Sequence, residues 1–255
     1  MMRRELNESF YESLYRDPLE GRSFEILSKT LAYRRIAKRL KLLWSRPRVL
    51  DVGFGSGDLL RETRRIFPGA SCSGIEIAAA AVDAVLRQHP DWYLTVGSAE
   101  RLPFPDQSFD LVVCSHTLEH LADDVPARRE LQRVTAKGGA IIVAVPGPGS
   151  GDNKLHYRLY DEKMVNRLFP DRAPQRVMTY GSALFLFVFW TLRLLARRLR
   201  IVQTAELQSS KGTGSLASRL GFRFGVPALL AFYLSDSVLV TKKRMPFELW
   251  ALWQI

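Results

Sequence analysis

The feature that most restricts the fold is a repeated alternation of short apolar runs with amphipathic segments over residues 48–148. Strands buried on both faces read as nearly continuous apolar runs, and amphipathic helices cover such strands. The pattern therefore predicts a doubly wound α/β domain with a mostly parallel sheet. Strands are expected at residues 48–53, 70–77, 92–100, 109–117 and 138–148, and helices at 24–44, 58–69, 78–88 and 124–135.

Charge and composition limit the environment and the partners. The net charge of +11 in 255 residues favours an anionic partner surface, either nucleic acid or a membrane leaflet. Residues 1–22 are polar and lack the apolar core of a signal peptide, so a cytoplasmic protein is expected. The two cysteines lie in strand-like runs and the four histidines are scattered, so neither a disulfide nor a metal site is expected.

A glycine-rich turn follows the first predicted strand, in the stretch VLDVGFGSGD. In doubly wound sheets, ligands bind at the carboxyl ends of the strands. A phosphate-binding loop of the Walker type needs Lys followed by Ser or Thr after the last glycine, but Gly57 is followed by Asp58. The glycines also lack the G-x-G-x-x-G spacing of a dinucleotide fingerprint. Asp51 and Asp58 flank the turn, which suits a ligand with positive charge.

The second strand ends at Glu76, in the stretch SGIEI. A carboxylate is an acceptor-only group, so at a strand tip it can accept hydrogen bonds from both hydroxyls of a ribose. A glycine turn beside a ribose-binding carboxylate indicates a ligand that contains adenosine. The acidic turn indicates that this ligand is cationic rather than phosphorylated.

These stretches, together with GSAERLPFPDQSFDLVVCSHTLEHL and GGAIIVAVP, resemble successive motifs of class I S-adenosylmethionine-dependent methyltransferases. They are most similar to the type 11 group, which includes quinone-biosynthesis methyltransferases. The likeness runs from about Arg48 to Pro146. It implies a Rossmann-like, mostly parallel seven-stranded sheet with S-adenosyl-L-methionine as cofactor. It also implies a helix at residues 161–169, a sixth strand at 175–180 and a seventh at 236–244.

The resemblance assigns roles to matching residues. Asp51, Gly53 and Gly55 are expected around the methionine part of the cofactor, Glu76 at the ribose, and Ser115 at the sulfonium. Ser98 stands where the family commonly has aspartate. The full set expected to bind the cofactor is Asp51, Gly53, Phe54, Gly55, Gly57, Glu76, Ile77, Ser98, Ala99, Glu100 and Ser115.

His116, His120 and His156 are the candidate general bases, and a hydroxyl, carbon-acid or ammonium acceptor requires such a base. His116 follows the fourth strand at the reactive end of the cofactor and is the first choice. His156 lies in a glycine-rich loop after the fifth strand, where Tyr157 and Tyr160 are candidate pocket residues. Glu119 and His120 stand where a helix should begin, and this pair is expected to orient the loop after the fourth strand rather than to take part in the chemistry. A purely structural role for each histidine is the alternative.

An apolar, arginine-rich insertion is expected between the last two strands. It has no charge from Gly181 to Leu192, a run shorter than the ~20 residues that span a bilayer. Arg193, Arg197 and Arg200 then share one helical face. A helical hairpin in the headgroup region fits this pattern. The alternatives are a hydrophobic lid over the substrate pocket and a homodimer interface.

Four regions follow from these patterns: an N-terminal helical segment or lid (1–45), the cofactor-binding core (46–180), the insertion (181–234), and the last strand with a C-terminal tail (235–255). The leading hypothesis is an enzyme that methylates a hydrophobic or lipid-linked acceptor as a peripheral protein of the inner membrane face. The first alternative is methylation of a soluble small molecule, such as a sugar or natural product. The second is a cofactor-binding interaction module without catalysis. Nucleic acid is disfavoured as a partner because no recognisable RNA-binding module is present.

Overall fold

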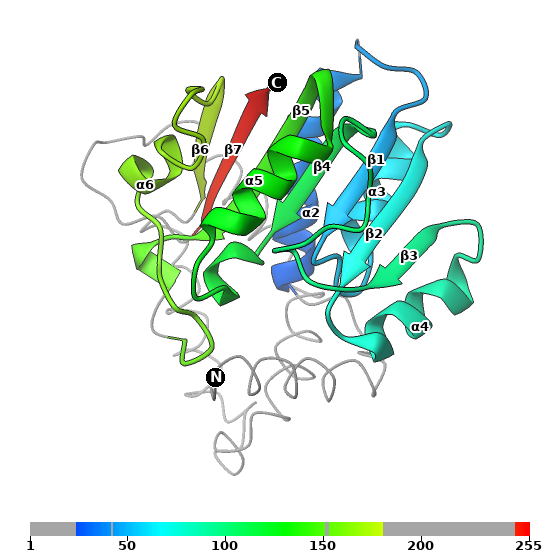
Figure 1. Ribbon diagram of the computed structural model, residues 1–255, viewed down its shortest axis with the longest axis horizontal. Coiled ribbons are helices and arrows are strands. Elements are labelled where there is room, and N and C mark those ends of the chain that lie inside the picture. The colour runs from blue at the N-terminus through cyan, green and yellow to red at the C-terminus, as the bar shows by residue number, and fades with distance from the viewer. Residues whose placement is uncertain (1–23, 42, 151–152, 181–247) are drawn as a thin grey trace, which may run out of the picture.

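The computed structural model describes residues 24–41, 43–150, 153–180 and 248–255 (Figure 1). Its centre is a seven-stranded sheet with the order β3-β2-β1-β4-β5-β7-β6. The strands are β1 (Arg48–Val52), β2 (Ser71–Glu76), β3 (Tyr93–Val96), β4 (Phe109–Ser115), β5 (Thr135–Pro146), β6 (Arg176–Tyr180) and β7 (Glu248–Gln254). β1 to β5 pair in parallel, and β7 is antiparallel to both of its neighbours. The doubly wound, mostly parallel α/β fold is confirmed.

Helices cover both faces of the sheet. They are α2 (Phe24–Leu40), α3 (Asp58–Ile66), α4 (Ala79–Gln88), α5 (Val125–Val134) and α6 (Glu162–Asn166), with 3₁₀ turns η1 (Leu118–His120) and η2 (Pro148–Ser150). Alternate residues of the strands face opposite sides, so the buried apolar residues form two clusters. One cluster contains Val49 and Ile142 with residues of α2, α3 and α4, and the other contains Leu50 and Ile141 with residues of α5 and α6. The two-layer covering explains why the strands are apolar throughout.

The first described helix packs on the core. Ala32, Ile36 and Leu40 of α2 are buried, and the Tyr33 hydroxyl lies 2.6 Å from Thr63 Oγ1 of α3. The guanidinium of Arg34 donates to both carboxylate oxygens of Glu62. Tyr33, buried against α3, and Arg34, paired with Glu62, therefore join α2 to the sheet through α3.

The seventh strand is not where the sequence was expected to place it. The expected segment, residues 236–244, lies outside the described residues, and the strand between β5 and β6 is Glu248–Gln254. Its sequence, ELWALWQ, is buried from Leu249 to Trp253 because it lies in the sheet interior rather than at an edge. The expectation was wrong because it preferred a run of β-branched residues to this tryptophan-rich one.

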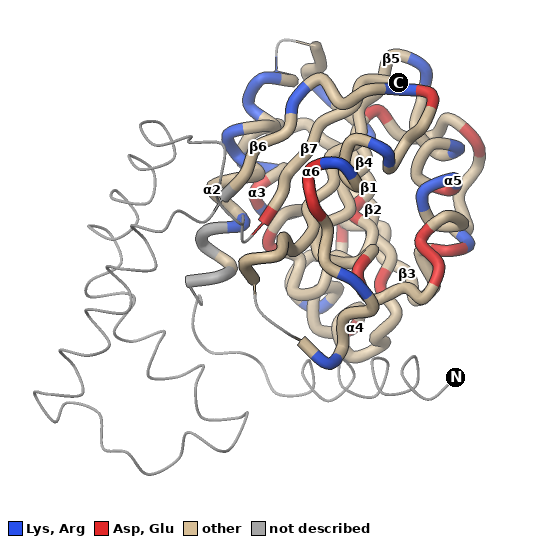
Figure 2. The backbone as a smooth tube through the Cα atoms, turned by 90° about the vertical axis from the view of Figure 1, so that its left-hand side faces the viewer, with Lys and Arg blue, Asp and Glu red and all other residues tan. Residues whose placement is uncertain are grey.

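Two segments named in the sequence analysis lie outside the described residues: the polar residues 1–22 and the apolar insertion at 181–234. The four proposed regions and their boundaries therefore stay predictions. Within the described ranges, every helix is too short or too polar to cross a bilayer. In α5 one acidic residue, Glu130, stands among the basic residues Arg128, Arg129 and Arg133 (Figure 2).

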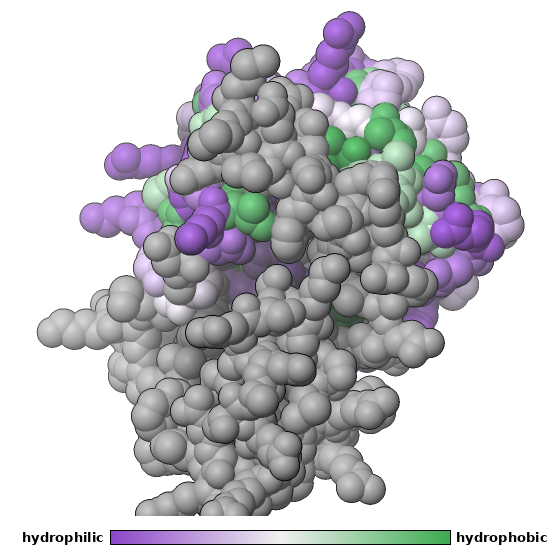
Figure 3. All heavy atoms as spheres, turned by 90° about the horizontal axis from the view of Figure 1, so that it is seen from below, coloured by the Kyte–Doolittle hydropathy of each residue, from purple (hydrophilic) through white to green (hydrophobic). Residues whose placement is uncertain are grey.

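The parallel strands all point toward the lower edge of the sheet in Figure 1. Figure 3 views the molecule from that side, where hydrophobic and hydrophilic described residues adjoin one another. The turns after β1, β2, β4 and β5 lie at this edge. It is the edge at which doubly wound folds bind their ligands.

Candidate active site

The glycine turn between β1 and α3 is built from left-handed backbone. Gly53, Gly55 and Gly57 have φ values of 75°, 54° and 77°, which residues with a Cβ adopt only under strain. Gly53 also lacks space for a side chain, because a Cβ there would lie 2.1 Å from Thr117 Oγ1 of the turn after β4. The chain therefore needs glycine at Gly53 both for its conformation and for a close approach.

The side chain of Phe54 points away from the turn into the core. It is 5% exposed, and a Cβ on Gly74 of β2 would lie 2.6 Å from its ring. Any contact between Phe54 and a cofactor is therefore expected from its backbone.

Asp51, in β1, is fully buried, and neither carboxylate oxygen has a hydrogen-bond partner among the described residues. Burial, followed by the negative charges of Glu76 and Asp58, raises its pKa to about 8. A buried carboxylate is costly without a compensating positive group. The site therefore favours a cationic ligand at this point.

Glu76, at the end of β2, holds the turn in place. Its Oε2 accepts from Gly55 N at 2.9 Å, and its Oε1 accepts from Ile77 N at 2.7 Å and Ala78 N at 3.4 Å. Burial raises its pKa, against the lowering effect of these backbone amides. The carboxylate thus fixes the distance between the first two strand ends, and its expected contact with a ribose stays a prediction.

The residues expected along the adenine edge follow β3. Ser98 Oγ accepts from the backbone N of Glu100 at 3.2 Å and lies 3.2 Å from Glu100 Oε2, while Ala99 between them is buried. Ile77 is 36% exposed on the neighbouring turn. Ser98, Ala99 and Glu100 form one compact turn, and their role in adenine binding stays a prediction.

His116 stands immediately after Ser115, the last residue of β4, in a left-handed conformation with φ of 53°. Its Nδ1 lies 3.2 Å from Glu119 Oε1, and its Nε2 lies 3.4 Å from Glu248 Oε1 of β7. The imidazole therefore sits between two carboxylates. Such an arrangement orients a histidine and stabilises its protonated form.

The electrostatic balance at His116 follows from these neighbours. Burial and the positive charge of Lys29 lower its pKa, but Glu119 and Glu248 outweigh them and the pKa is raised. Burial raises the pKa of Glu248, but the interactions with His116, Lys29 and Trp250 together outweigh burial and lower it to about 2. Ion pairs of His116 with Glu119 and Glu248 therefore link the end of β4 to η1 and to β7.

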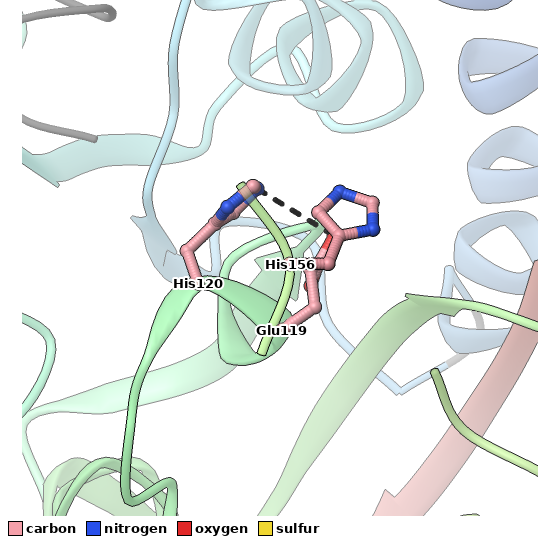
Figure 4. Close-up of side chains that lie close together, drawn as sticks. All are labelled: Glu119, His120 and His156. Carbon is pink, nitrogen blue, oxygen red and sulfur yellow. Dashed lines mark ion pairs between the residues drawn. The ribbon is translucent and has the colours of Figure 1, made fainter. Parts of the chain in front are cut away.

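Three of the four histidines lie close together. The rings of His120 in η1 and His156 after η2 have centroids 4.9 Å apart, and His120 Nε2 lies 3.9 Å from Glu119 Oε1. Figure 4 shows both rings beside the Glu119 carboxylate. The histidines that look scattered in the sequence thus gather, with His116, around one buried acid.

Sequence reasoning missed Glu248 and gave Glu119 only a supporting role. Glu119 is fully buried, which the polar stretch HTLEH does not indicate. Glu248 precedes a strand that was not predicted. Tyr160 was expected to line a pocket, but its side chain is buried and its hydroxyl donates to Asp124 Oδ2 at 2.7 Å.

Asp51 and the glycine turn fit S-adenosyl-L-methionine. The uncompensated buried carboxylate of Asp51 matches a ligand that carries an ammonium and a sulfonium, and the turn offers backbone without side chains. Glu76, Ser98, Ala99 and Glu100 are the residues that would hold the nucleoside part.

Known proteins support this assignment. Residues 50–143 match the family described as "Methyltransferase domain". A demethylmenaquinone methyltransferase of Deinococcus radiodurans is 30% identical over 156 residues, covering 57% of this chain and 65% of that protein. A malonyl-[acyl-carrier protein] O-methyltransferase of Halorhodospira halophila is 37% identical over 119 residues, covering 45% of this chain and 40% of that protein.

Among solved structures, a Galdieria sulphuraria protein assigned as a sarcosine dimethylglycine methyltransferase has a TM-score of 0.61 at 15% identity. The match covers 89% of this chain and 85% of that one. At this identity the likeness shows the shared fold. The chain spans just under two thirds of the Deinococcus relative and less than half of the Halorhodospira relative.

Proposed function

We propose that this chain, whose residues 50–143 form a class I S-adenosylmethionine-dependent methyltransferase domain, methylates a hydrophobic or lipid-linked acceptor at a membrane surface. The observation that carries the methyl-transfer proposal is the pairing of the left-handed glycine turn with the buried, uncompensated Asp51. A cationic nucleoside satisfies both features, whereas a phosphate ligand would offer no positive charge to the buried carboxyl group of Asp51.

The protein contributes to the reaction by aligning the acceptor with the cofactor and by supplying charged side chains. The bound cofactor supplies an electrophilic methyl group on a sulfonium. Holding the acceptor in a near-attack geometry lowers the barrier by up to ~7–11 kcal/mol. In this proposal His116 accepts a proton from a hydroxyl or carbon-acid acceptor, supported by Glu119 and Glu248, whose carboxylates lie beside its two ring nitrogens.

Two observations support a hydrophobic acceptor near a membrane. The Deinococcus relative is named for demethylmenaquinone, a quinone substrate. In the sequence, residues 181–247 carry ten of the 37 basic residues but only two of the 26 acidic ones, beside the uncharged run from Gly181 to Leu192. Each Lys or Arg near an anionic leaflet adds ~1 kcal/mol of attraction.

Mass spectrometry after incubation with cofactor tests the acceptor class. The full chain is added with S-adenosyl-L-methionine to a membrane-lipid extract and, separately, to a soluble metabolite pool. We expect a product 14 Da heavier than its precursor, the mass of one added CH₂, in the lipid extract only. An Asp51→Asn variant is the matched control for cofactor-dependent methylation.

The second candidate is methylation of a soluble acceptor, including a carboxylate held on a carrier. The Halorhodospira relative, named for malonyl-[acyl-carrier protein], favours it. A methylated product confined to the soluble pool would support this candidate and reject the lipid-linked one.

Flotation with anionic liposomes at low salt tests the membrane surface. We expect the full chain to rise with the vesicles and to stay at the bottom in high salt, because salt screens surface charge. Monomeric protein that stays at the bottom under both conditions would reject the membrane proposal while leaving methyl transfer intact.

A further inference from the structure

We propose that Glu119, His120 and His156 bind one divalent transition-metal ion. The three side chains come from η1 and from the loop after η2, two segments that meet at the carboxyl ends of β4 and β5. Each offers one ligand atom, and these atoms all lie within 4.8 Å of one another. None of the three residues is among those expected to bind the cofactor, although Glu119 also contacts His116, and a metal site here goes beyond the proposed function.

The buried state of Glu119 is an independent observation that favours a cation beside it. Its side chain is fully buried, and neither oxygen has a hydrogen-bond partner among the described residues. Its closest positive neighbours, His116 Nδ1 at 3.2 Å and His120 Nε2 at 3.9 Å, both approach Oε1. Both of these neighbours are imidazoles, which carry a positive charge only when protonated, and buried charges in proteins are paired or coordinate metals.

The orientation of His120 prepares one nitrogen as a ligand. Its Nδ1 lies 3.3 Å from the carbonyl oxygen of Leu155, so donation from Nδ1–H leaves the lone pair on Nε2. Nε2 is the nitrogen that lies nearer to Glu119. Histidines that bind metals are commonly fixed in this way, through a hydrogen bond from the other ring nitrogen.

The remaining geometry needs only small rotations. Two ligand atoms that each lie about 2.1 Å from a tetrahedral ion are about 3.4 Å apart. The His120–Glu119 separation of 3.9 Å is close to that value. The ligand atom of His156 lies within 4.8 Å of the other two, and the terminal torsions of His and Glu are broad enough to bring the three atoms closer.

The ligand types indicate the class of ion. Imidazole suits Zn²⁺, Fe²⁺, Co²⁺ and Ni²⁺, whereas Mg²⁺ and Ca²⁺ prefer oxygen ligands throughout. Two histidines and one glutamate also form the ligand set of many catalytic zinc sites. Three protein ligands leave at least one position open for water or an external oxygen atom.

Cobalt titration of the full chain tests the site directly. The protein carries no histidine tag, is stripped with a chelator, and is titrated with Co²⁺ while visible absorption is recorded. We expect saturation at one ion per chain, displacement by Zn²⁺, and no displacement by millimolar Mg²⁺. The readout does not depend on methyl transfer.

Variants identify the ligands. His120→Gln and His156→Gln should each weaken Co²⁺ binding at least 100-fold, and Glu119→Gln should do the same if it folds. His89→Gln is the matched control, because His89 stacks on Trp92 after α4 and lies outside the cluster. Its binding should equal that of the unchanged protein. No saturable Co²⁺ or Zn²⁺ binding, or equal binding by the His120/His156 double variant, would overturn the proposal.

Discussion

The two halves of the ligand-binding edge are built in different ways. At β1 and β2 the site is made of backbone, with Gly53, Gly55 and Gly57 in left-handed conformations and Glu76 accepting three amides. At β4, β5 and β7 it is made of side chains from distant parts of the sequence, with His116 between Glu119 and Glu248. The first half is shaped by the backbone of two short turns, and the second half is held together by contacts between charged side chains.

The two halves should therefore be sensitive to different changes. The backbone half should fail when a side chain is added, because its shape depends on the absence of Cβ atoms. The charged half should tolerate changes of shape but respond to pH. Each prediction below tests one half against the other.

The largest effect is expected for Gly53→Ala. The new Cβ would lie 2.1 Å from Thr117 Oγ1 in backbone with φ of 75°, so we expect a loss of about 2–4 kcal/mol of unfolding free energy. Binding of the demethylated cofactor should fall at least 100-fold by calorimetry. Gly138→Ala is the control, because φ is 77° there but no atom lies within 4 Å of the added Cβ. It should cost only about 1 kcal/mol, and equal losses in both variants would contradict a close approach at Gly53.

Asp51→Asn should weaken binding of S-adenosylmethionine about 10- to 100-fold, the range for a hydrogen bond to a charged group. The pKa of Asp51 is about 8 in the folded chain against an ordinary 3.8, so the folded chain holds a proton that the unfolded chain releases between those values. The free protein should therefore lose stability as pH rises from about 4 to 8, and the variant should lose less. Chemical denaturation across this pH range measures both slopes.

Cofactor binding at pH 7 should also release a proton from Asp51, since a cationic ligand favours the carboxylate. Calorimetry in buffers of different ionisation enthalpy detects the proton. A binding heat that is the same in all buffers would contradict the pairing of Asp51 with positive charge.

His116→Gln should lower turnover about tenfold or more and leave cofactor affinity unchanged. Because the pKa of His116 is raised, kcat/KM of the unchanged protein should increase with pH through a value above 6.5. This rise should be absent in the variant. Turnover equal to that of the unchanged protein would remove His116 from the mechanism.

Glu248→Gln should have the smallest effect. It removes one of the two acids that raise the pKa of His116, so the rise of kcat/KM should move to lower pH by less than about one unit. The pKa of Glu248 is about 2 when folded, so its contribution to stability is present above about 4.5 and is lost as pH falls toward 2. The variant should lack this acid-sensitive part of the stability. An unshifted pH profile would place His116 under the control of Glu119 alone.

The sequence predicted the backbone half well and the charged half poorly. The glycine turn, Asp51 and Glu76 are contiguous with buried strands, so apolar pattern and spacing locate them. His116, Glu119 and Glu248 meet only when β7 inserts between β5 and β6, and pairing over more than a hundred residues leaves no periodic signal. The burial of Glu119 could not be predicted from the sequence either, because it depends on how the folded chain arranges His116 and His120 around this side chain.

The pairing of Tyr180 with Glu248 in the β6–β7 ladder has a further consequence. Tyr180 and Glu248 flank residues 181–247 and are partners in this antiparallel ladder, so the chain leaves and rejoins the sheet at neighbouring positions. Loop-closure entropy changes by only about 0.6 kcal/mol for each doubling of loop length. A change in the length of this segment should therefore cost the sheet little free energy, because the pairing of β6 with β7 fixes both of its ends.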